Sequence, residues 1–380
     1  MKKVVVLGST GSVGKNALQV IAKHKNDFRI VGLTANSNAK LLGRQANYFK
    51  PRLLALGDSS EYRKLKCELR TPKKILKGIE GISEVASMSE ADIVIVAISG
   101  TSAILPLVSA IKAKKKIALA NKESIVSAGR IIMNLARSRG VEIIPVDSEH
   151  NSIFQCIKDV NKEEIKNIFL MGSGGPLRDV SGSIFDKLKP SRILKHPVWK
   201  MGKKISVDSA TMMNKGLEVI EASYLFGIDI SKIKVLLHPE AIIHSMIEFI
   251  DGNVAANLFY PDMKMPIFYA LNYPKRIPSK LPRINFSKIK NISFRTPSER
   301  KFPALKLCYK IAKKGGTYPA CLDGANEEAV RLYLGNKLSF TGITDTVKKV
   351  LTRHKNIKTP SLDDILHVNN WAKEEVKRLC

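Results

Sequence analysis

Acidic, basic and amide side chains recur at short spacing in two separate parts of this chain. In the apolar stretch 209–226, polar side chains fall three or four positions apart, at Thr211, Asn214, Lys215 and Glu218. This spacing places them on one side of a helix. Because the remaining surface of this helix is apolar and needs burial, we expect the stripe to face an internal cavity, where Lys215 and Glu218 can contact a ligand or a metal. A solvated helix face with an ion pair is the alternative for this pattern taken alone.

A second acidic cluster follows the apolar segment 141–147, which we interpret as a short buried strand. Asp147 and Glu149 lie two residues apart, so in an extended chain both side chains point the same way. Two carboxylates at the end of a strand, joined by a third from a helix, would suit Mg²⁺ or Mn²⁺. The spacing alone does not show that Glu218 meets them, and acidic strand ends without a ligand are common.

The N-terminus carries a pattern that favours a dinucleotide. An apolar strand over 3–7 is followed by Gly8, Gly11 and Gly14 and then by a helical run over 15–23. Glycines let the backbone turn tightly and approach a pyrophosphate, which lies on the free amides at the start of the helix. The spacing is G-x-x-G-x-x-G rather than G-x-G-x-x-G. A purely structural turn is the alternative.

The next strand, 29–35, ends where an NAD enzyme usually carries an acid for the ribose hydroxyl. This chain has neutral donors and a cation there instead, at Asn36, Ser37, Asn38 and Lys40. Such residues suit a 2′-phosphate, so the sequence favours NADP. A plain loop is the alternative.

Three further turns follow strand-like segments. Strands over 91–98 and 116–120 extend the sheet, and the second runs into Asn121, Lys122 and Glu123, on the side where nicotinamide binds. Lys122 could hold a substrate oxygen, or be one more lysine in a lysine-rich chain.

A strand over 165–171 ends in a glycine-rich turn with Ser173, which exposes amides and a hydroxyl to an anion. Trp199 lies among Pro and Gly in the loop 195–204, which we interpret as a lid; a Trp packed on the surface is the alternative.

These motifs must be positioned by secondary-structure elements. The alternation of strand-like and helix-like segments along the sequence predicts an α/β fold. We expect an N-terminal Rossmann-like dinucleotide-binding domain over 1–137 and an α/β catalytic, metal-binding domain over 138–272 with its lid loop at 195–204. A Pro- and Lys-rich linker, 273–299, would lead to a mainly helical C-terminal domain over 300–380.

Composition excludes several classes of protein. No apolar run is long enough to cross a bilayer, and the chain starts directly on its first strand, so we expect neither membrane nor signal segment. Five cysteines without metal or redox spacing fit the cytoplasm. The net charge of +29 could indicate a nucleic-acid-binding module, which is the non-enzyme alternative. However, the lysines are scattered rather than gathered in an aromatic-bearing patch, so we expect no nucleic acid, with steering of anionic ligands as a secondary role.

Together these motifs resemble the 1-deoxy-D-xylulose 5-phosphate reductoisomerase family along the whole chain. The resemblance is carried by Gly8 to Gly14, Asn121-Lys-Glu123, Asp147-Ser-Glu-His150, Ser173-Gly-Gly-Pro176, His196-Pro-Val-Trp199 and above all the block Lys204 to Glu218; later matches are His238-Pro-Glu, His244-Ser-Met, Pro261-Asp-Met and Gly324 to Ala329. It implies a homodimeric oxidoreductase that uses NADPH and Mg²⁺ or Mn²⁺ to make 2-C-methyl-D-erythritol 4-phosphate from its sugar phosphate. Another NADP-dependent dehydrogenase is the alternative enzyme, although such enzymes generally lack three carboxylates for a metal.

The resemblance also implies roles for individual residues. The metal ligands would be Asp147, Glu149 and Glu218, of which Glu149 and Glu218 also contact substrate. Phosphate contacts would come from Ser173, Ser209, Asn214 and Lys215, and contacts near the reacting carbons from Lys122, Ser148 and His196, with Trp199 covering the pocket. NADPH would be held by Gly8, Thr10, Gly11, Ser12, Val13, Asn36, Ser37, Asn38, Asn121, Glu123 and Gly202.

Some positions depart from the family pattern. Val198 and Lys200 replace polar residues in the lid, Asp323-Gly324 stands where Asn-Ala is common, and Phe259-Tyr260 stands where a glycine is frequent. We expect the last two changes to affect packing or subunit contact rather than chemistry.

Overall fold

The computed structural model describes residues 1–71, 73–194 and 202–380. These residues form two compact units. Unit 1 contains 1–124, 132–151 and 262–281, and unit 2 contains 125–131, 152–261 and 282–380. Two helices, α6 (Lys122–Arg139) and α7 (Ser148–Cys156), contribute residues to both units. The three-domain boundaries at 137, 272 and 300 stay a prediction.

Unit 1 is built on a seven-stranded parallel sheet in the order β4-β3-β2-β1-β5-β6-β7. Its strands are β1 (Lys2–Leu7), β2 (Phe28–Ala35), β3 (Leu53–Leu56), β4 (Lys74–Lys77), β5 (Ile93–Val96), β6 (Lys116–Leu119) and β7 (Ile143–Pro145). The strand order reverses between β1 and β5, as in dinucleotide-binding folds. The Rossmann-like expectation is therefore confirmed.

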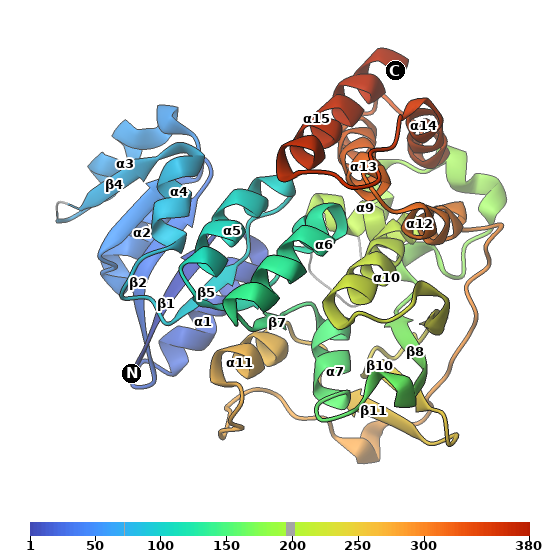
Figure 1. The fold of residues 1–380 in the computed structure, drawn as a ribbon, viewed down its shortest axis with the longest axis horizontal. Helices are drawn as coiled ribbons and strands as arrows, with labels where there is room; N and C mark the ends of the chain where they lie inside the picture. The colour runs from blue at the N-terminus through green and yellow to red at the C-terminus, as the bar shows by residue number, and fades with distance from the viewer. Residues whose placement is uncertain (72, 195–201) are drawn as a thin grey trace. The chain divides into compact units, whose positions relative to one another are not determined.

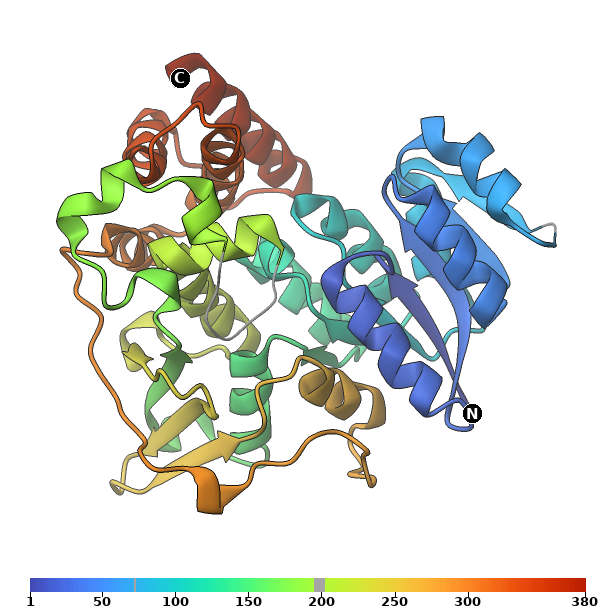
Figure 2. The same cartoon turned by 180° about the vertical axis from the view of Figure 1, so that it is seen from behind.

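Helices cover both faces of this sheet. Figure 2 shows α1 (Ser12–Lys23) and α2 (Ala39–Phe49) on one face, and Figure 1 shows α4 (Gly78–Ala86) and α5 (Ile104–Lys112) on the other. The short α3 (Tyr62–Glu68) packs on α2, and α11 (Lys264–Asn272) packs on α1. With helices on both faces, β1 from Val4 onward and all of β5 are buried, which explains their continuous Val and Ile runs.

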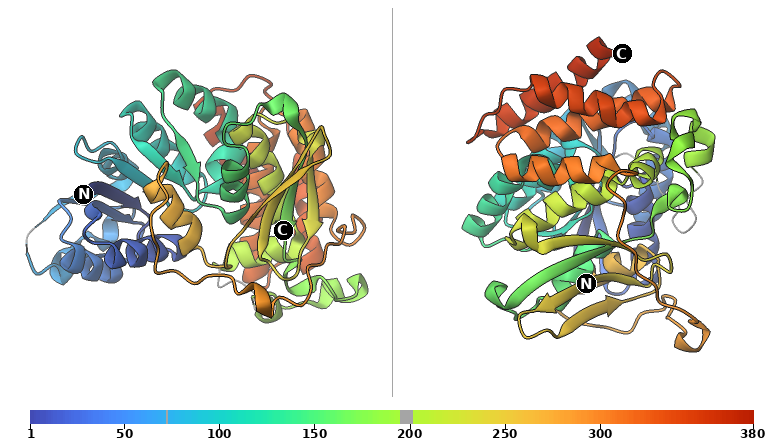
Figure 3. Two further views of the ribbon diagram at one scale, coloured as in Figure 1. Left: turned by 90° about the horizontal axis from the view of Figure 1, so that it is seen from below. Right: turned by 90° about the vertical axis from the view of Figure 1, so that its right-hand side faces the viewer.

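Unit 2 combines a four-stranded mixed sheet with a layer of helices. The sheet order is β11-β10-β8-β9, from β8 (Ile165–Gly172), β9 (Ile233–Leu237), β10 (Ile243–Phe249) and β11 (Val254–Leu258). Its helices are α8 (Pro190–Ile193), α9 (Lys203–Thr211), α10 (Met213–Phe226), α12 (Pro303–Lys314), α13 (Tyr318–Leu334), α14 (Phe340–Arg353) and α15 (Leu362–Leu379). Within this unit, α10 lies between the sheet and the helices α12 to α15 (Figure 3), and one apolar core joins them.

Short 3₁₀ helices complete the chain. They are η1 (Ser59–Glu61), η2 (Thr101–Ala103), η3 (Lys162–Glu164), η4 (Gly175–Leu177), η5 (Gly182–Lys187), η6 (Ile230–Lys232) and η7 (Phe286–Lys288). The stretch expected as a linker is largely irregular. It carries η7 and pairs with β9 through a single bridge between Arg295 and Leu237.

Two local expectations were wrong. The helix expected over 209–226 is interrupted, because Met212 has a left-handed backbone (φ 61°) that ends α9 and begins α10. Thr211 therefore belongs to α9, apart from the other three residues of the stripe. The extended backbone expected from Asp147 to Glu149 is also absent, since Glu149 lies in the first turn of α7.

Candidate active site

The glycine turn of unit 1 is shaped by close backbone contacts. Gly8 has a φ of 77°, and a Cβ there would lie 2.5 Å from the carbonyl oxygen of Ala97. A Cβ on Gly14 would lie 2.3 Å from the carbonyl oxygen of Gly8. A side chain at either position would collide with backbone atoms, so the sequence must keep glycine at both.

The start of α1 offers free amides. Its N-cap, Gly11, has no side chain to accept a hydrogen bond from the first turn. Gly11 and Ser12 are exposed, and Thr10 and Val13 are half-buried. Unsatisfied amides at the positive end of a helix form an anion site, which fits the pyrophosphate of a dinucleotide.

The end of β2 is exposed at Asn36, Ser37 and Asn38, and the Asn38 side chain caps α2 by accepting from the amide of Leu41 at 3.1 Å. A pocket of about 560 Å³ adjoins this turn, with Ser37, Asn38, Lys40, Arg63 and Lys64 in its lining. Sequence analysis missed Arg63 because it comes from α3, well beyond the β2 turn along the chain. A basic residue at this pocket favours a phosphate.

The loop after β6 is held by its own side chains. Asn121 caps α6 by accepting from the amide of Ser124 at 2.9 Å, and it donates to the carbonyl oxygens of Ile98 and Gly100 and to Glu123. These hydrogen bonds fix the conformation of the loop and therefore the position of Lys122, the first residue of α6.

Unit 1 brings Lys122 to the acidic cluster. The Lys122 ammonium lies 3.0 Å from a carboxylate oxygen of Asp147, and Ser148 donates to Glu149 at 2.5 Å. Burial alone would raise the pKa of Asp147, but the charge of Lys122 and the hydrogen bond of His150 hold it well below its usual range. Two neighbouring carboxylates, of which Asp147 is held in its ionised form, are donors that suit a hard divalent cation. His150, which is fully buried, belongs to the Asp147–His150 motif but was not predicted to take part in binding or catalysis.

In unit 2, α10 carries the other charged group. Glu218 is 1 % exposed, accepts from Asn214 at 2.5 Å and pairs with Lys215. Lys215 also donates to the carbonyl oxygen of Met171 at 2.6 Å. Lys215 and Glu218 are buried and Asn214 is half-buried, which excludes the solvated-face alternative; that this face borders a cavity stays a prediction.

The glycine-rich turn after β8 approaches the same residues. A Cβ on Gly175 would lie 3.1 Å from the hydroxyl oxygen of Ser209, and a Cβ on Gly172 would lie 3.2 Å from Cε of Lys215. The turn that carries Ser173 therefore lies beside Ser209 and Lys215. A cation, two hydroxyls and a nearby amide are donors suited to a phosphate monoester.

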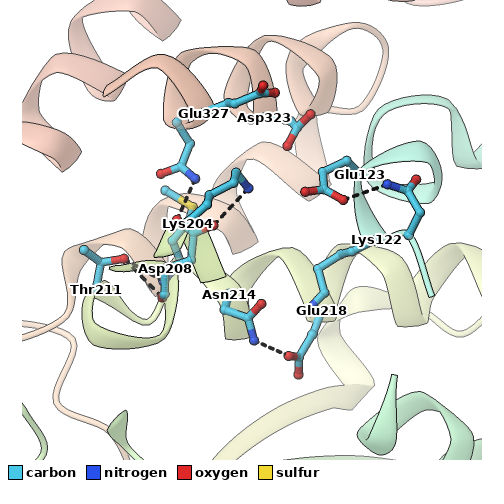
Figure 4. A network of polar contacts seen from close by, with 12 residues as sticks. Lys122, Glu123, Lys204, Asp208, Thr211, Asn214, Glu218, Asp323 and Glu327 are labelled. Atoms are coloured by element: carbon cyan, nitrogen blue, oxygen red, sulfur yellow. Dashed lines mark hydrogen bonds and ion pairs between the residues drawn. The ribbon is translucent and has the colours of Figure 1, made fainter. Parts of the chain in front are cut away.

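A polar network supports α9 within unit 2 (Figure 4). Asp208 is buried and accepts from Lys204 at 3.0 Å and from Asn326 of α13 at 2.8 Å. The network joins the family-like blocks 204–218 and 324–329, and it was not anticipated, because nothing in the sequence pairs two segments so far apart.

The predicted lid falls largely outside the described residues. His196, Val198, Trp199 and Lys200 belong to 195–201. The last three residues of the loop, 202–204, are described, and among them Gly202 is exposed and is the N-cap of α9. Of the other departures, Phe259 is buried and packs within the protein, whereas Tyr260 is exposed. Phe259 stacks on His244 with ring centroids 3.7 Å apart.

A dinucleotide-binding fold, joined in one chain to clustered carboxylates and phosphate donors, defines a nicotinamide-dependent oxidoreductase. Models of three domains match this chain: 1-deoxy-D-xylulose 5-phosphate reductoisomerase over 4–129, its C-terminal domain over 143–226, and the DXP reductoisomerase C-terminal domain over 258–375. The chain therefore belongs to the 1-deoxy-D-xylulose 5-phosphate reductoisomerase family.

Individual relatives agree along their full length. The 1-deoxy-D-xylulose 5-phosphate reductoisomerase of Caldanaerobacter subterraneus is 46 % identical over 379 residues, covering 100 % of this chain and 99 % of that protein. The Zymomonas mobilis enzyme in complex with NADPH is 38 % identical with a TM-score of 0.92, covering 100 % and 98 %. A DOX-P reductoisomerase in complex with NADPH, fosmidomycin and magnesium is 35 % identical with a TM-score of 0.94, covering 100 % and 99 %.

Proposed function

We propose that this protein converts 1-deoxy-D-xylulose 5-phosphate to 2-C-methyl-D-erythritol 4-phosphate in non-mevalonate isoprenoid biosynthesis. The observation that carries this proposal is the full-length similarity to reductoisomerases, at 46 % identity, in a chain that keeps the carboxylates and phosphate donors of the motifs. A general NADP-dependent dehydrogenase would not need the acids Asp147, Glu149 and Glu218.

NADPH is the proposed reductant. Its pyrophosphate would lie on the amides of Thr10 to Val13 at the start of α1, where the Gly8 turn allows close approach. Asn36, Ser37 and Asn38 would hold the adenosine ribose, and Arg63 would contribute a cation to its 2′-phosphate. Asn121, Glu123 and Gly202 are the remaining proposed contacts.

A divalent metal, Mg²⁺ or Mn²⁺, is the second proposed cofactor. Its proposed ligands are Asp147, Glu149 and Glu218. When bound, it supplies a Lewis acid for substrate oxygens that gain negative charge during cleavage and rejoining of a C–C bond. Lys122 keeps Asp147 ionised and ready to bind a cation.

The protein's own side chains orient the substrate. Ser173, Ser209, Asn214 and Lys215 would bind the phosphate, and this binding, remote from the reacting carbons, fixes the orientation of the carbon chain. Lys122, Ser148 and His196 would contact its oxygens. Trp199, in the lid, would cover the pocket and exclude water from the aldehyde before its reduction.

The decisive experiment follows NADPH oxidation with 1-deoxy-D-xylulose 5-phosphate, with and without added Mg²⁺ or Mn²⁺. We expect oxidation only with metal, and formation of 2-C-methyl-D-erythritol 4-phosphate. Replacing a charged ligand with an amide in Glu218→Gln should lower turnover by about 100-fold or more, while NADPH still binds. Glu248→Gln, on β10, is the matched control and should leave turnover unchanged. Metal-independent oxidation, or an active Glu218→Gln enzyme, would contradict the proposal.

Assembly and location complete the proposal. We propose a homodimer, supported by the family and by β11, an edge strand of its sheet whose first residue, Val254, is exposed, as is Ile250 in the preceding turn. Light scattering during size-exclusion chromatography would test it, and a monomeric mass would overturn it.

We also propose a cytoplasmic location, since all five cysteines are unpaired thiols. Among the described residues, no helix combines the length and apolarity needed to span a membrane.

A further inference from the structure

Unit 2 contains a pocket whose lining includes none of the residues proposed for catalysis. It has a volume of about 660 Å³ and lies between η5, the segment 298–303 and the start of α14. That volume falls within the range of about 300–1,000 Å³ typical of small-molecule sites. Its lining residues all belong to unit 2, so the pocket is complete within one compact body.

The apolar part of the pocket is rigid. Phe185, Phe302 and Phe340 line it and are each at least nine-tenths buried. The ring of Phe185 packs at 5.6 Å from that of Phe340 and at 6.2 Å from that of Phe302, measured between centroids. Three rings held in the core present a preformed apolar surface to anything that enters.

The polar part of the pocket is cationic and rich in hydroxyls. Arg300 is exposed, lines the pocket and makes no ion pair with any residue that the structure describes. Lys301 beside it donates to the carbonyl oxygen of Arg178 at 2.6 Å, so its position is fixed. The acid in the lining, Asp345, lies 3.1 Å from Lys348, which offsets its charge. Ser181, Ser183 and Ser298 add hydroxyls, whereas the hydroxyl of Thr341 donates to Asp186 at 2.6 Å.

A hydroxyl in the lining has no protein partner. Thr344, on α14, is 6 % exposed as a residue, and within the described chain its hydroxyl makes no hydrogen bond. This hydroxyl is therefore available to a ligand that enters the pocket. The first amides of the same helix also lack intrahelical partners, and the Ser339 side chain accepts from one of them, the amide of Gly342, at 3.2 Å. Thr344 and the helix start thus supply independent donors to one pocket.

From these contacts we propose that the pocket binds a small organic phosphate with a short apolar body. The phosphate would be held by Arg300, the hydroxyl of Thr344 and the start of α14, and the apolar body would lie on Phe185, Phe302 and Phe340. Inorganic phosphate alone would make no contact with the apolar part of the lining. A neutral apolar molecule would leave the cation and hydroxyls without an acceptor.

Calorimetric titration with phenyl phosphate, without NADPH or substrate, tests the proposal. We expect binding to the unaltered protein, weaker by about tenfold or more in Arg300→Ala, because a charge-assisted contact is lost. Thr344→Val should weaken binding several-fold, because the variant keeps the shape of the side chain and loses the hydroxyl. Phenol and inorganic phosphate should each bind much more weakly than phenyl phosphate.

Two matched controls separate binding from folding. Thr346→Val changes a buried threonine of the same helix that does not line the pocket, and Arg283→Ala removes an exposed arginine elsewhere in the segment before α12. Both should bind phenyl phosphate like the unaltered protein. The melting temperature of ligand-free Thr344→Val should not fall, because its hydroxyl makes no hydrogen bond to lose.

Some results would overturn the proposal. Equal affinity in Arg300→Ala, Thr344→Val and the unaltered protein would place the bound phosphate elsewhere, for example on the donors near Lys215. Absence of binding, or equal affinity for inorganic phosphate, would also contradict it. Because no turnover is measured, a failure of the proposed reaction would leave this result unaffected.

Discussion

At the scale of single residues, the Lys122 ammonium has a testable effect on Asp147. Burial favours the protonated acid, but Lys122 at 3.0 Å and His150 outweigh it and lower the pKa of Asp147. Lys122→Met should therefore raise that pKa, so the acid limb of the pH profile of kcat/KM moves to higher pH, by about one unit or more. Lys122→Arg retains the charge and should keep the limb near its original pH. The position of the limb, rather than the rate, is measured, and an unchanged limb in Lys122→Met would contradict this role.

A second residue-scale prediction concerns Gly324, one of the family departures. In α13, a Cβ at this position would lie 2.3 Å from the carbonyl oxygen of Asn369 in α15, whose side chain donates to Asp323 at 3.2 Å. Helix propensity favours Ala over Gly by about 1 kcal/mol, but overpacking against backbone costs about 1–3 kcal/mol, so Gly324→Ala should be destabilised.

Chemical denaturation measures this effect. Gly335→Ala, at the end of the same helix, is the control, because its nearest contacts would be ordinary ones at 3.5 Å. It should change the free energy of unfolding by less than about 0.5 kcal/mol. A Gly324→Ala protein as stable as the control would show that α15 can move away from α13.

At the scale of elements, the contact between the start of α13 and the end of α14 predicts that the free energy of unfolding depends on pH. Burial lowers the pKa of His354, whose ring accepts or donates a hydrogen bond with Thr317 at 2.9 Å and packs against Trp371. Because the folded pKa lies below the unfolded value of about 6.5, the unfolded chain binds more protons below that pH. This contribution to stability is therefore complete above about pH 6.5 and is lost as the pH falls toward the folded pKa.

Urea denaturation of the unaltered protein and of His354→Gln measures this contribution. The free energy of unfolding should decline more steeply between about pH 6.5 and pH 5 in the unaltered protein, because glutamine does not titrate. Parallel declines would show that His354 does not couple folding to protonation.

Elements differ in how well the sequence predicts them. The strands β1, β2, β5, β6 and β7 follow from apolar runs, and the Gly8 turn follows from the spacing of its glycines, whereas β3 and β4 were not predicted. The break at Met212 could not be predicted, because a left-handed methionine has no local signal and depends on packing around α9 and α10. Likewise, Asp147 to Glu149 looked extended, because α7 begins with residues that carry no strong helix pattern.

At the scale of the whole molecule, residues brought together by the fold were the hardest to predict. Arg63 joins Asn38 and Lys40 at one pocket, and Asn326 reaches Asp208, in each case across a long separation along the chain. Side chains adjacent in sequence, such as Asn214, Lys215 and Glu218, were found correctly because helical periodicity already relates them. Local spacing thus predicts parts of the site, and tertiary contacts supply the rest.

The charge of the whole chain leads to the last prediction. A net charge of +29 attracts anions, and both the proposed substrate and NADPH are anionic. Salt shortens the reach of this attraction from about 10 Å at 0.1 M to about 3 Å at 1 M. The value of kcat/KM should therefore fall as KCl rises at constant Mg²⁺, mainly through KM, whereas sucrose at equal osmolality should have little effect. If kcat/KM is insensitive to salt, while duplex DNA is retained in a salt-dependent manner without NADPH binding, the positive charge serves nucleic acid instead.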